Sequence, residues 1–265
     1  MISPVLAASA ALLGAEPAAA ENPAPPRPGY ALVWRDEFEG DTIDPEKWSP
    51  WRLGPRRDAI NTPDAVSLDG EGRLVITTTR VAEEDGSPGY RTGGVWTPET
   101  YLARYGYFET RMKVQGEVGF WSAFWLQSPS MGRHIGDPAK GGVEIDVIEY
   151  LCNGKNLNKA KHAIHWDGYG EHHKVDHHES ERPGTHVGFH TYALEWKPDE
   201  LIFFVDGEET WRTDKAVPRI EQFMILSCEV GSWAGDIGDA DLPERVLVDW
   251  VRVWQRPISG GDQPD

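Results

Sequence analysis

Three carboxylates lie within one apolar stretch of six residues, EIDVIE at positions 144–149. The density of β-branched residues predicts a strand, in which successive side chains point to opposite faces. Glu144 and Asp146 therefore share a face, whereas Glu149 is out of phase by one residue. A one-residue β-bulge after Asp146 would return Glu149 to that face. All three acids would then point into one cleft.

This arrangement suits the hydrolysis of glycosidic bonds. With the bulge, Glu144 and Glu149 lie about four strand steps apart, which is roughly 13 Å. Side chains that lean toward each other could close this to the ~5–5.5 Å carboxyl separation of a retaining glycosidase. Like charges at such range would hold one proton at neutral pH. The alternative is an acidic edge strand on a solvated face, which the flanking Ile and Val side chains disfavour.

Further motifs around the acid cluster are similar to those of glycoside hydrolase family 16. The cluster resembles the family's E-x-D-x-x-E signature in its bulged, laminarinase-like form, and the resemblance covers about residues 30–256. Six other segments follow the family order: VWRDEF at 33–38, YGYFETR at 105–111, GFWSAFWL at 119–126, FHTYALEW at 189–196, FVDG at 204–207 and VDWVRVW at 248–254.

Short apolar or alternating runs recur along the chain, such as RLVITTT at 73–79 and LIFFV at 201–205, and Asp-Gly turn pairs separate them. Many short strands in 265 residues predict an all-β fold. We expect a two-sheet antiparallel β-sandwich of the jelly-roll, concanavalin-like type. One face of one sheet must remain open as a cleft that holds the acids.

The two ends of the chain are expected to lie outside this sandwich. An apolar segment followed by Ala-Ala-Ala predicts a signal peptide over residues 1–20, with an Ala-rich disordered tail as the alternative. Residues 21–29 form a Pro-rich linker, residues 30–256 the glycoside hydrolase domain and residues 257–265 a disordered tail. The apolar run of roughly a dozen residues is too short to span a membrane, so we expect a secreted or periplasmic protein.

The resemblance implies a secreted, endo-acting, retaining β-glycan hydrolase, with an endo-β-1,3(4)-glucanase favoured. Glu144 would be the nucleophile, Glu149 the general acid and base, and Asp146 the residue that orients Glu144. A β-galactan hydrolase acting on agar, porphyran or carrageenan is the enzymatic alternative. A non-catalytic lectin on the same fold is the alternative from another class, although such a lectin would be expected to lack one of the acids.

Aromatic residues near the acids are candidates for stacking on sugar rings. Trp121 and Trp125 are four residues apart and share one face of a regular strand, and Trp233 lies in a glycine-flanked loop. By resemblance, His165 hydrogen-bonds a catalytic carboxylate or a substrate hydroxyl, whereas Trp166 faces the core. Glu229, Arg91 and Glu109 complete the substrate-binding candidates.

No cofactor is expected for catalysis, but the resemblance implies a structural calcium ion on the convex face. Its ligands would be Glu37, the carbonyl of Gly70, and Asp249. A hydrogen-bond network without a metal is the alternative. For Cys152 and Cys228 the sequence leaves two alternatives open, a disulfide or two free thiols. The histidine pairs at 172–173 and 177–178 predict an exposed loop near the cleft rather than a zinc site.

The formal net charge of −17 argues against nucleic acid as a partner. It also provides no general attraction for sulfated polysaccharides, although a local basic patch could override it. The expected partner is a polysaccharide substrate, and the protein is expected to be a monomer.

Overall fold

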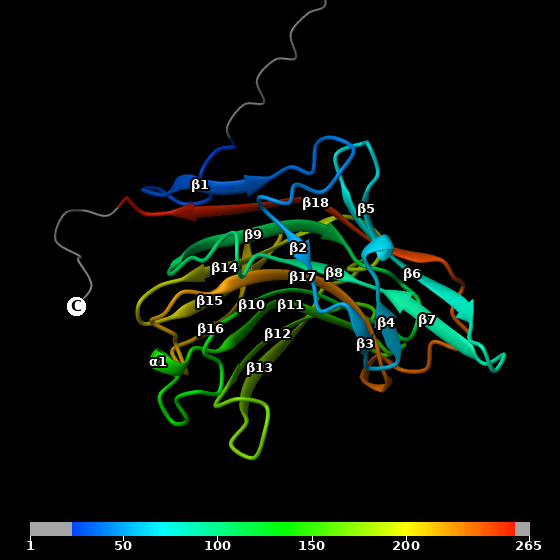
Figure 1. Cartoon of the computed structure of the whole chain (residues 1–265). Coiled ribbons are helices and arrows are strands. Elements are labelled where there is room, and N and C mark those ends of the chain that lie inside the picture. Colours follow the sequence, from blue (N-terminus) through cyan, green and yellow to red (C-terminus); the bar gives the residue numbers. More distant parts are fainter. Residues whose placement is uncertain (1–22, 258–265) are drawn as a thin grey trace, which may run out of the picture.

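The computed structural model describes residues 23–257, and Figure 1 shows them as two curved layers of strands. The predicted signal peptide at 1–20 and nearly all of the predicted tail at 257–265 lie outside the described residues. Residues 23–29 form turns and bends that lead into the first strand.

The larger sheet has eleven strands and forms the outer layer. Its order is β16 (Glu208–Thr213), β15 (Leu201–Val205), β14 (His190–Trp196), β9 (Gly106–Lys113), β18 (Glu244–Gln255), β6 (Leu74–Ala82), β7 (Pro88–Thr92), β4 (Ala59–Asn61) and β3 (Gly54–Arg56). Two further strands join it, β1 (Ala31–Asp36) beside β18 and β5 (Val66–Leu68) beside β6.

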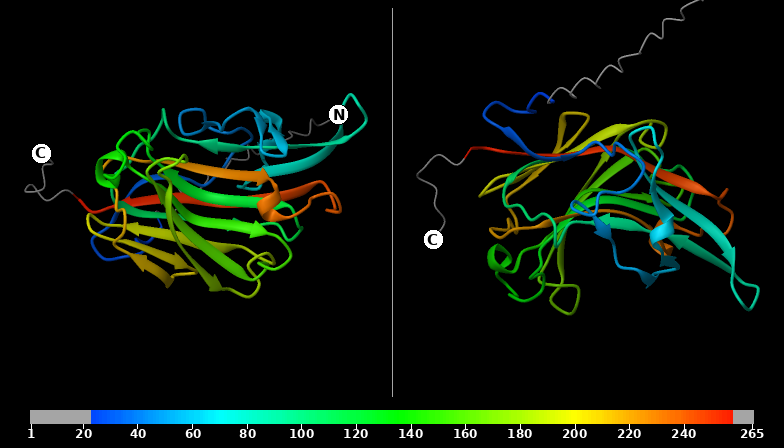
Figure 2. Two further views of the ribbon diagram at one scale, coloured as in Figure 1. Left: turned by 90° about the horizontal axis from the view of Figure 1, so that it is seen from below. Right: turned by 45° about the horizontal axis from the view of Figure 1, so that its top comes forward.

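The smaller sheet has seven strands and carries the acid cluster. Its order is β13 (Lys174–Glu181), β12 (Lys159–Trp166), β11 (Glu144–Cys152), β10 (Phe120–Gln127), β17 (Phe223–Val230), β8 (Gly94–Trp96) and β2 (Ser49–Pro50). Figure 2 gives a view onto this sheet from below, with β10 to β13 in green and β17 in orange. The acids are thus placed near the middle of the sheet, since β11 has neighbours on both sides.

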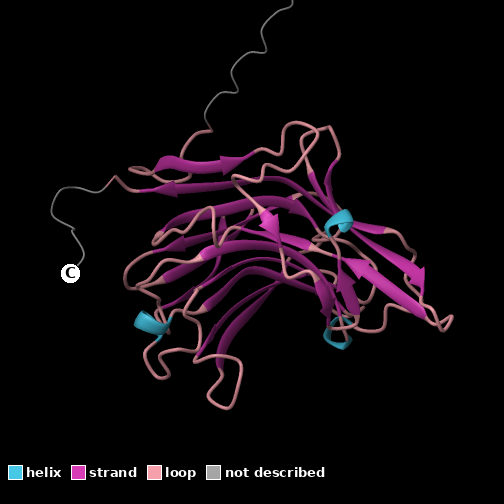
Figure 3. Ribbon diagram, in the orientation of Figure 1, coloured by secondary structure: helices cyan, strands magenta, loops and turns pink. Residues whose placement is uncertain are grey.

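Helical structure among the described residues is limited to three single turns (Figure 3). They are η1 (Pro63–Ala65), α1 (Pro138–Gly141) and η2 (Ser232–Ala234). None of these is long or apolar enough to cross a membrane. The predicted all-β sandwich is therefore confirmed. One detail differs, because β4 pairs with β7 in parallel, whereas every other strand pair in the two sheets is antiparallel.

The core lies between the two sheets and is almost entirely apolar. Ile145, Val147 and Ile148 of β11 are fully buried there, together with Phe124 and Leu126 of β10. Burial of each such side chain contributes ~1.5–3 kcal/mol to folding. This apolar face fixes which way β11 is turned, and so directs its acids to the opposite, open face.

The predicted bulge is present in β11. Trp125 of β10 pairs with Asp146, but the next residue along, Phe124, pairs with Ile148, so Val147 is the extra residue. The same irregularity separates Asp146 from Glu149 in the pairing with β12. Both Val147 and Ile148 enter the core rather than one of them, and Glu149 returns to the face of Asp146.

A disulfide between the two cysteines, one of the two alternatives above, is absent. Cys152 and Cys228 are buried free thiols in the core. They lie on β11 and β17, which are separated by β10. Two strand spacings of ~4.8 Å place the Cα atoms roughly 9–10 Å apart, beyond the ~7 Å that a disulfide can bridge.

The expectation of an exposed histidine loop is only partly correct. Residues 174–181 form the edge strand β13, in which His177 pairs with Ala163 of β12. His172 and His173 precede that strand and are exposed. Trp166, predicted to face the core, is partly buried against it.

Candidate active site

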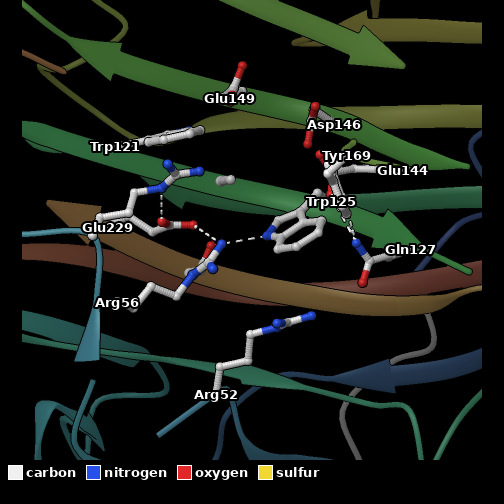
Figure 4. A pocket seen from close by; sticks show the side chains of 13 residues that line it. Arg52, Arg56, Trp121, Trp125, Gln127, Glu144, Asp146, Glu149, Tyr169 and Glu229 are labelled. Atoms are coloured by element: carbon white, nitrogen blue, oxygen red, sulfur yellow. Dashed lines mark hydrogen bonds and ion pairs between the residues drawn. The ribbon is translucent and has the colours of Figure 1, made fainter. Parts of the chain in front are cut away.

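The three acids of β11 line one cleft on the open face of the smaller sheet, with a volume of about 370 Å³. Glu144, Asp146 and Glu149 point into it beside the side chains of β10 (Figure 4). The register explains this convergence: Glu144 lies opposite Gln127, Asp146 opposite Trp125, and Glu149 opposite Ala123.

Glu144 is held by two donors. The Tyr169 hydroxyl donates a short hydrogen bond to Oε2 of Glu144, and Nε2 of Gln127 donates to the same oxygen at 3.1 Å. Burial raises the pKa of Glu144 to about 8, and the neighbouring charge of Asp146 adds to this, whereas the Tyr169 hydrogen bond opposes it. Glu144 thus retains a proton at neutral pH, as expected for a cluster of like charges.

Asp146 is nine-tenths buried and lies between the two glutamates. Burial and the charge of Glu149 raise its pKa well above the ordinary value. Nε2 of His165 lies 3.3 Å from Oδ2 of Asp146 and 3.9 Å from Oε1 of Glu144. Glu144, Asp146 and His165 are also the described residues whose ligand atoms come close enough, within 4.8 Å of one another, to hold a metal ion.

His165 contacts a second histidine on its other side. Its Nδ1 lies 2.9 Å from Nε2 of His173, and the two rings stack with centroids 5.1 Å apart. Burial lowers the pKa of His165, so the ring is neutral at pH 7. Oδ2 of Asp146 has no hydrogen-bond partner among the described residues, so the contact with His173 at Nδ1 is what orients the neutral His165 ring.

Glu149 has a cationic partner that the sequence did not single out. Nζ of Lys161 lies 2.6 Å from Oε2 of Glu149, and the side chains are 19% and 6% exposed. Lys161 pairs with Glu149 across β11 and β12. An ion pair so little exposed compensates the burial of a charge that would otherwise be costly.

Trp125, Trp121 and Trp233 differ in their availability to a sugar ring. Trp125 is 6% exposed and donates from Nε1 to Ser227 at 3.0 Å. Trp121 is 8% exposed and stacks on Trp233, with ring centroids 5.5 Å apart. Trp233 lies in η2 and is 63% exposed. Trp121 and Trp125 line the cleft as predicted, and Trp233 extends the aromatic surface beside it.

Glu229 lines the cleft as predicted, but its carboxylate is engaged by two arginines. Arg56 donates from Nη2 to Oε1 of Glu229 at 2.9 Å, and Nε of Arg57 makes a short contact with Oε2. Arg52, Arg56 and Arg57 all line the cleft. Glu229 therefore has little capacity left to bind a sugar hydroxyl.

Two predicted cleft residues lie elsewhere. Arg91 is on β7 of the larger sheet and pairs with Glu83 at 2.9 Å. Glu109 is on β9 of the larger sheet, where its neighbours Phe108 and Thr110 are fully buried. Alternation along the strand therefore turns Glu109 to the outer face. Burial there raises its pKa to about 7, away from the cleft.

The predicted calcium ligands have other partners. Both guanidinium nitrogens of Arg252 bind the carboxylate of Glu37, at 2.9 and 2.8 Å. Arg111 donates to Oδ2 of Asp249 at 2.5 Å. Gly70 lies in the turn before β6, with φ of 74°. These two carboxylates do not fit a calcium ion as they stand, because it would have to displace two arginines.

Several residues of the cleft were missed by sequence reasoning. Tyr169 and Gln127 carry no local pattern that marks them, and Lys161 and the three arginines read as ordinary surface charges. The adjacent Arg56 and Arg57, near Trp51, were the one available signal. Their position depends on pairing between distant strands, which the sequence does not specify.

Comparisons with known proteins agree with the geometry. The model of the family described as glycosyl hydrolases family 16 matches residues 55–252. Keratan-sulfate endo-1,4-beta-galactosidase from Sphingobacterium multivorum is 27% identical over 88% of this chain and 57% of that protein. The chain spans between 34% and 57% of the length of three of its curated relatives.

Solved structures share the fold over most of their length. The laminarinase catalytic domain from Thermotoga maritima superposes with a TM-score of 0.69 at 26% identity, covering 85% of this chain and 98% of that one. Porphyranase B from Zobellia galactanivorans gives a TM-score of 0.71 at 26% identity, covering 89% and 96%. Together with the motifs of the acid strand, these matches mean that the chain belongs to glycosyl hydrolase family 16.

Proposed function

We propose that this protein cleaves internal β-glycosidic bonds of a polysaccharide with net retention of anomeric configuration. The observation that carries the proposal is the convergence of Glu144, Asp146 and Glu149 from one bulged strand into one cleft. Double displacement requires two carboxyl groups that flank the scissile bond, one as nucleophile and one as acid and base. The presence of all three acids disfavours a non-catalytic lectin.

In the first step, Glu144 attacks the anomeric carbon as the carboxylate, so the proton that Glu144 holds without substrate must first pass within the acid cluster to Glu149. Its oxygen forms a bond to that carbon while the bond to the leaving oxygen breaks, and Glu149 gives its proton to the leaving oxygen. In the second step, water attacks the same carbon, passes a proton to Glu149, and releases Glu144. No further reactant is needed, and no cofactor is required for these steps.

Residues around the nucleophile would hold it in line. Tyr169 and Gln127 fix Oε2 of Glu144, which leaves Oε1 to face the sugar. Asp146 orients Glu144 and shares its proton, supported by His165.

The substrate class is a β-glycan, with a β-1,3- or mixed-linkage β-1,3(4)-glucan as the first candidate. A β-galactan such as agar, porphyran or carrageenan is the second candidate. The specific observation that favours the sulfated members of this second class, porphyran and carrageenan, is the presence of three arginines in the cleft. Relatives named for both kinds of substrate are consistent with either.

The deciding experiment measures reducing ends released from laminarin, mixed-linkage glucan, agarose, porphyran and κ-carrageenan. Glu144→Gln is the blank. Cleavage of any of these polymers by the wild type but not by the variant supports the proposal. Full activity in Glu144→Gln would exclude Glu144 as the nucleophile. Binding without cleavage of any polymer on the panel would favour a non-catalytic lectin.

We also propose that the protein is secreted or periplasmic and that it is a monomer. A structural calcium ion stays a hypothesis. Because the carboxylates of Glu37 and Asp249 have arginine partners, calcium would have to bind chiefly through carbonyl oxygens near Gly70. Excess chelator should then lower the melting temperature without changing the initial rate at low temperature. An unchanged melting temperature would exclude a structural calcium ion.

A further inference from the structure

Three arginines gather on one side of a cleft whose other side is acidic. Arg52, Arg56 and Arg57 come from the segment around β3 and line the same cleft as the catalytic acids. Figure 4 places Arg52 and Arg56 on the far side of Trp125 from Asp146 and Glu149. Such a concentration of positive charge is unexpected in a chain with a net charge of −17.

The charges on this side are not balanced by the protein. Glu229 is the one carboxylate that contacts the cluster, and it serves both Arg56 and Arg57. Among residues 23–257, Arg52 makes no ion pair, and its guanidinium lies 6.0 Å from the ring of Trp96. Three positive charges therefore face one negative charge. Lys161 does not alter this balance, because it pairs with Glu149 on the opposite side.

Two of the three arginines, Arg56 and Arg57, are held by Glu229 and by aromatic rings, whereas Arg52 is exposed. The guanidinium of Arg56 lies 4.7 Å from the ring centroid of Trp51, and that of Arg57 lies 4.1 Å from that of Trp121. Arg52 and Arg57 have φ of 39° and 50°, in the left-handed region that costs a non-glycine residue about 1–2 kcal/mol. Such backbone strain persists where the surrounding structure fixes the local conformation, and strained residues cluster at functional sites.

We propose that the cleft selects a β-glycan that carries an anionic substituent, either a sulfate ester or a uronate carboxylate. This inference rests on the proposed hydrolase function and specifies its substrate class. The substituent's oxygens would accept hydrogen bonds from Arg52, and the charges of Arg56 and Arg57 in the same cleft would add to the attraction. A planar guanidinium matches both oxyanions in a two-point contact that hydroxyl groups cannot reproduce.

A neutral glucan would offer Arg52 no anionic partner. Because Arg52 is exposed, its guanidinium can keep water when a neutral chain is bound, so it gains no charge-assisted contact there. The cluster therefore favours anionic polymers over neutral ones. The competing explanation is that the arginines only brace Glu229 and Trp121, in which case neutral and anionic polymers would bind equally.

Binding, rather than turnover, tests the inference independently of catalysis. The ligands are one backbone in three forms, namely curdlan, its sulfate and its carboxymethyl derivative, together with porphyran before and after desulfation. Binding is measured with the inactivated chain Glu144→Gln, and repeated with Glu149→Gln. Arg52→Gln and Arg57→Gln are added to this background, and Arg245→Gln, an exposed arginine on β18, is the matched control.

The anionic form of at least one backbone should bind about tenfold more tightly than its neutral form. Arg52→Gln should weaken that binding about three- to tenfold, reduce its salt dependence, and leave the neutral form unchanged. Arg245→Gln should have no effect. The sulfate and carboxymethyl arms identify which oxyanion is preferred.

Equal binding of anionic and neutral forms of both backbones would overturn the inference, as would an equal loss with Arg52→Gln and Arg245→Gln. These results leave the hydrolase proposal intact if a neutral polymer is cleaved. Conversely, preferential binding of an anionic polymer without cleavage by the wild type would support the inference and refute the hydrolase.

Discussion

Replacing Glu144 by Gln should stabilise this protein at neutral and alkaline pH while it removes activity. Burial raises the pKa of Glu144 to about 8, against an ordinary value of 4.5. Between these values the native state holds a proton that the unfolded state has released. The free energy of unfolding must therefore fall as pH rises through this window.

The size of the effect follows from the width of the window. Each pH unit is worth about 1.4 kcal/mol, which gives an upper limit near 5 kcal/mol. The side chain of Glu144 is 14% exposed, so solvent should reduce the effect to about 2–4 kcal/mol. Gln has the shape of the protonated acid, and its carbonyl can still accept from Tyr169 and Gln127. Below pH 4.5 the two proteins should therefore be equally stable.

The measurement is denaturant unfolding of both proteins from pH 4 to pH 9. The difference between the two stabilities should rise with pH and level off near pH 8. Burial lowers the pKa of His162 to about 4, which destabilises both proteins below pH 6.5 and cancels in the difference. Glu99→Gln, at an exposed glutamate, is the control. A difference that stays flat from pH 5 to pH 8 would refute the reasoning.

Three further outcomes are expected from single changes around the cleft. Tyr169→Phe removes the hydroxyl donor to Glu144 and should lower kcat/KM about tenfold at constant melting temperature. An unchanged pH–rate profile would show that Tyr169 does not hold the Glu144 carboxyl. Lys161→Met leaves Glu149 buried without a partner and should destabilise the fold by about 2–4 kcal/mol, and adding Glu149→Gln should restore most of the loss in denaturant unfolding. Trp233→Ala removes an exposed ring and should weaken oligosaccharide binding about three- to tenfold, with stability changed by less than about 0.5 kcal/mol; calorimetry that finds equal affinity would exclude a sugar platform.

The local sequence pattern was sufficient to place a site residue wherever its position depended on a single strand. Glu144, Asp146 and Glu149 were placed on one face from alternation and a single bulge, and β11 has that bulge. Trp121 and Trp125 followed from the same two-residue period. Each of these inferences needs only the residues of one strand and the knowledge that one of its faces is apolar.

Inference failed where a residue's surroundings come from distant parts of the chain. Glu109 was expected in the cleft, but its strand belongs to the other sheet. The sequence could not decide whether Cys152 and Cys228 form a disulfide, because their separation depends on which strand lies between β11 and β17. In both cases the missing information was strand order, which alternation does not encode.

Residue patterns and motifs were enough to predict the all-β class, the family, the acid strand and the direction in which its acids point. The fold class and the direction of the acids depend on period-two patterning and turn residues, which act over a few positions, whereas the family rests on the resemblance of the motifs. The tertiary structure alone decided the partners of those acids: Tyr169 and Gln127 for Glu144, Lys161 for Glu149, and the three arginines opposite. Such partners are brought together by strand pairing and loop closure over long sequence separations, so the charge balance of the cleft exists only in the folded chain.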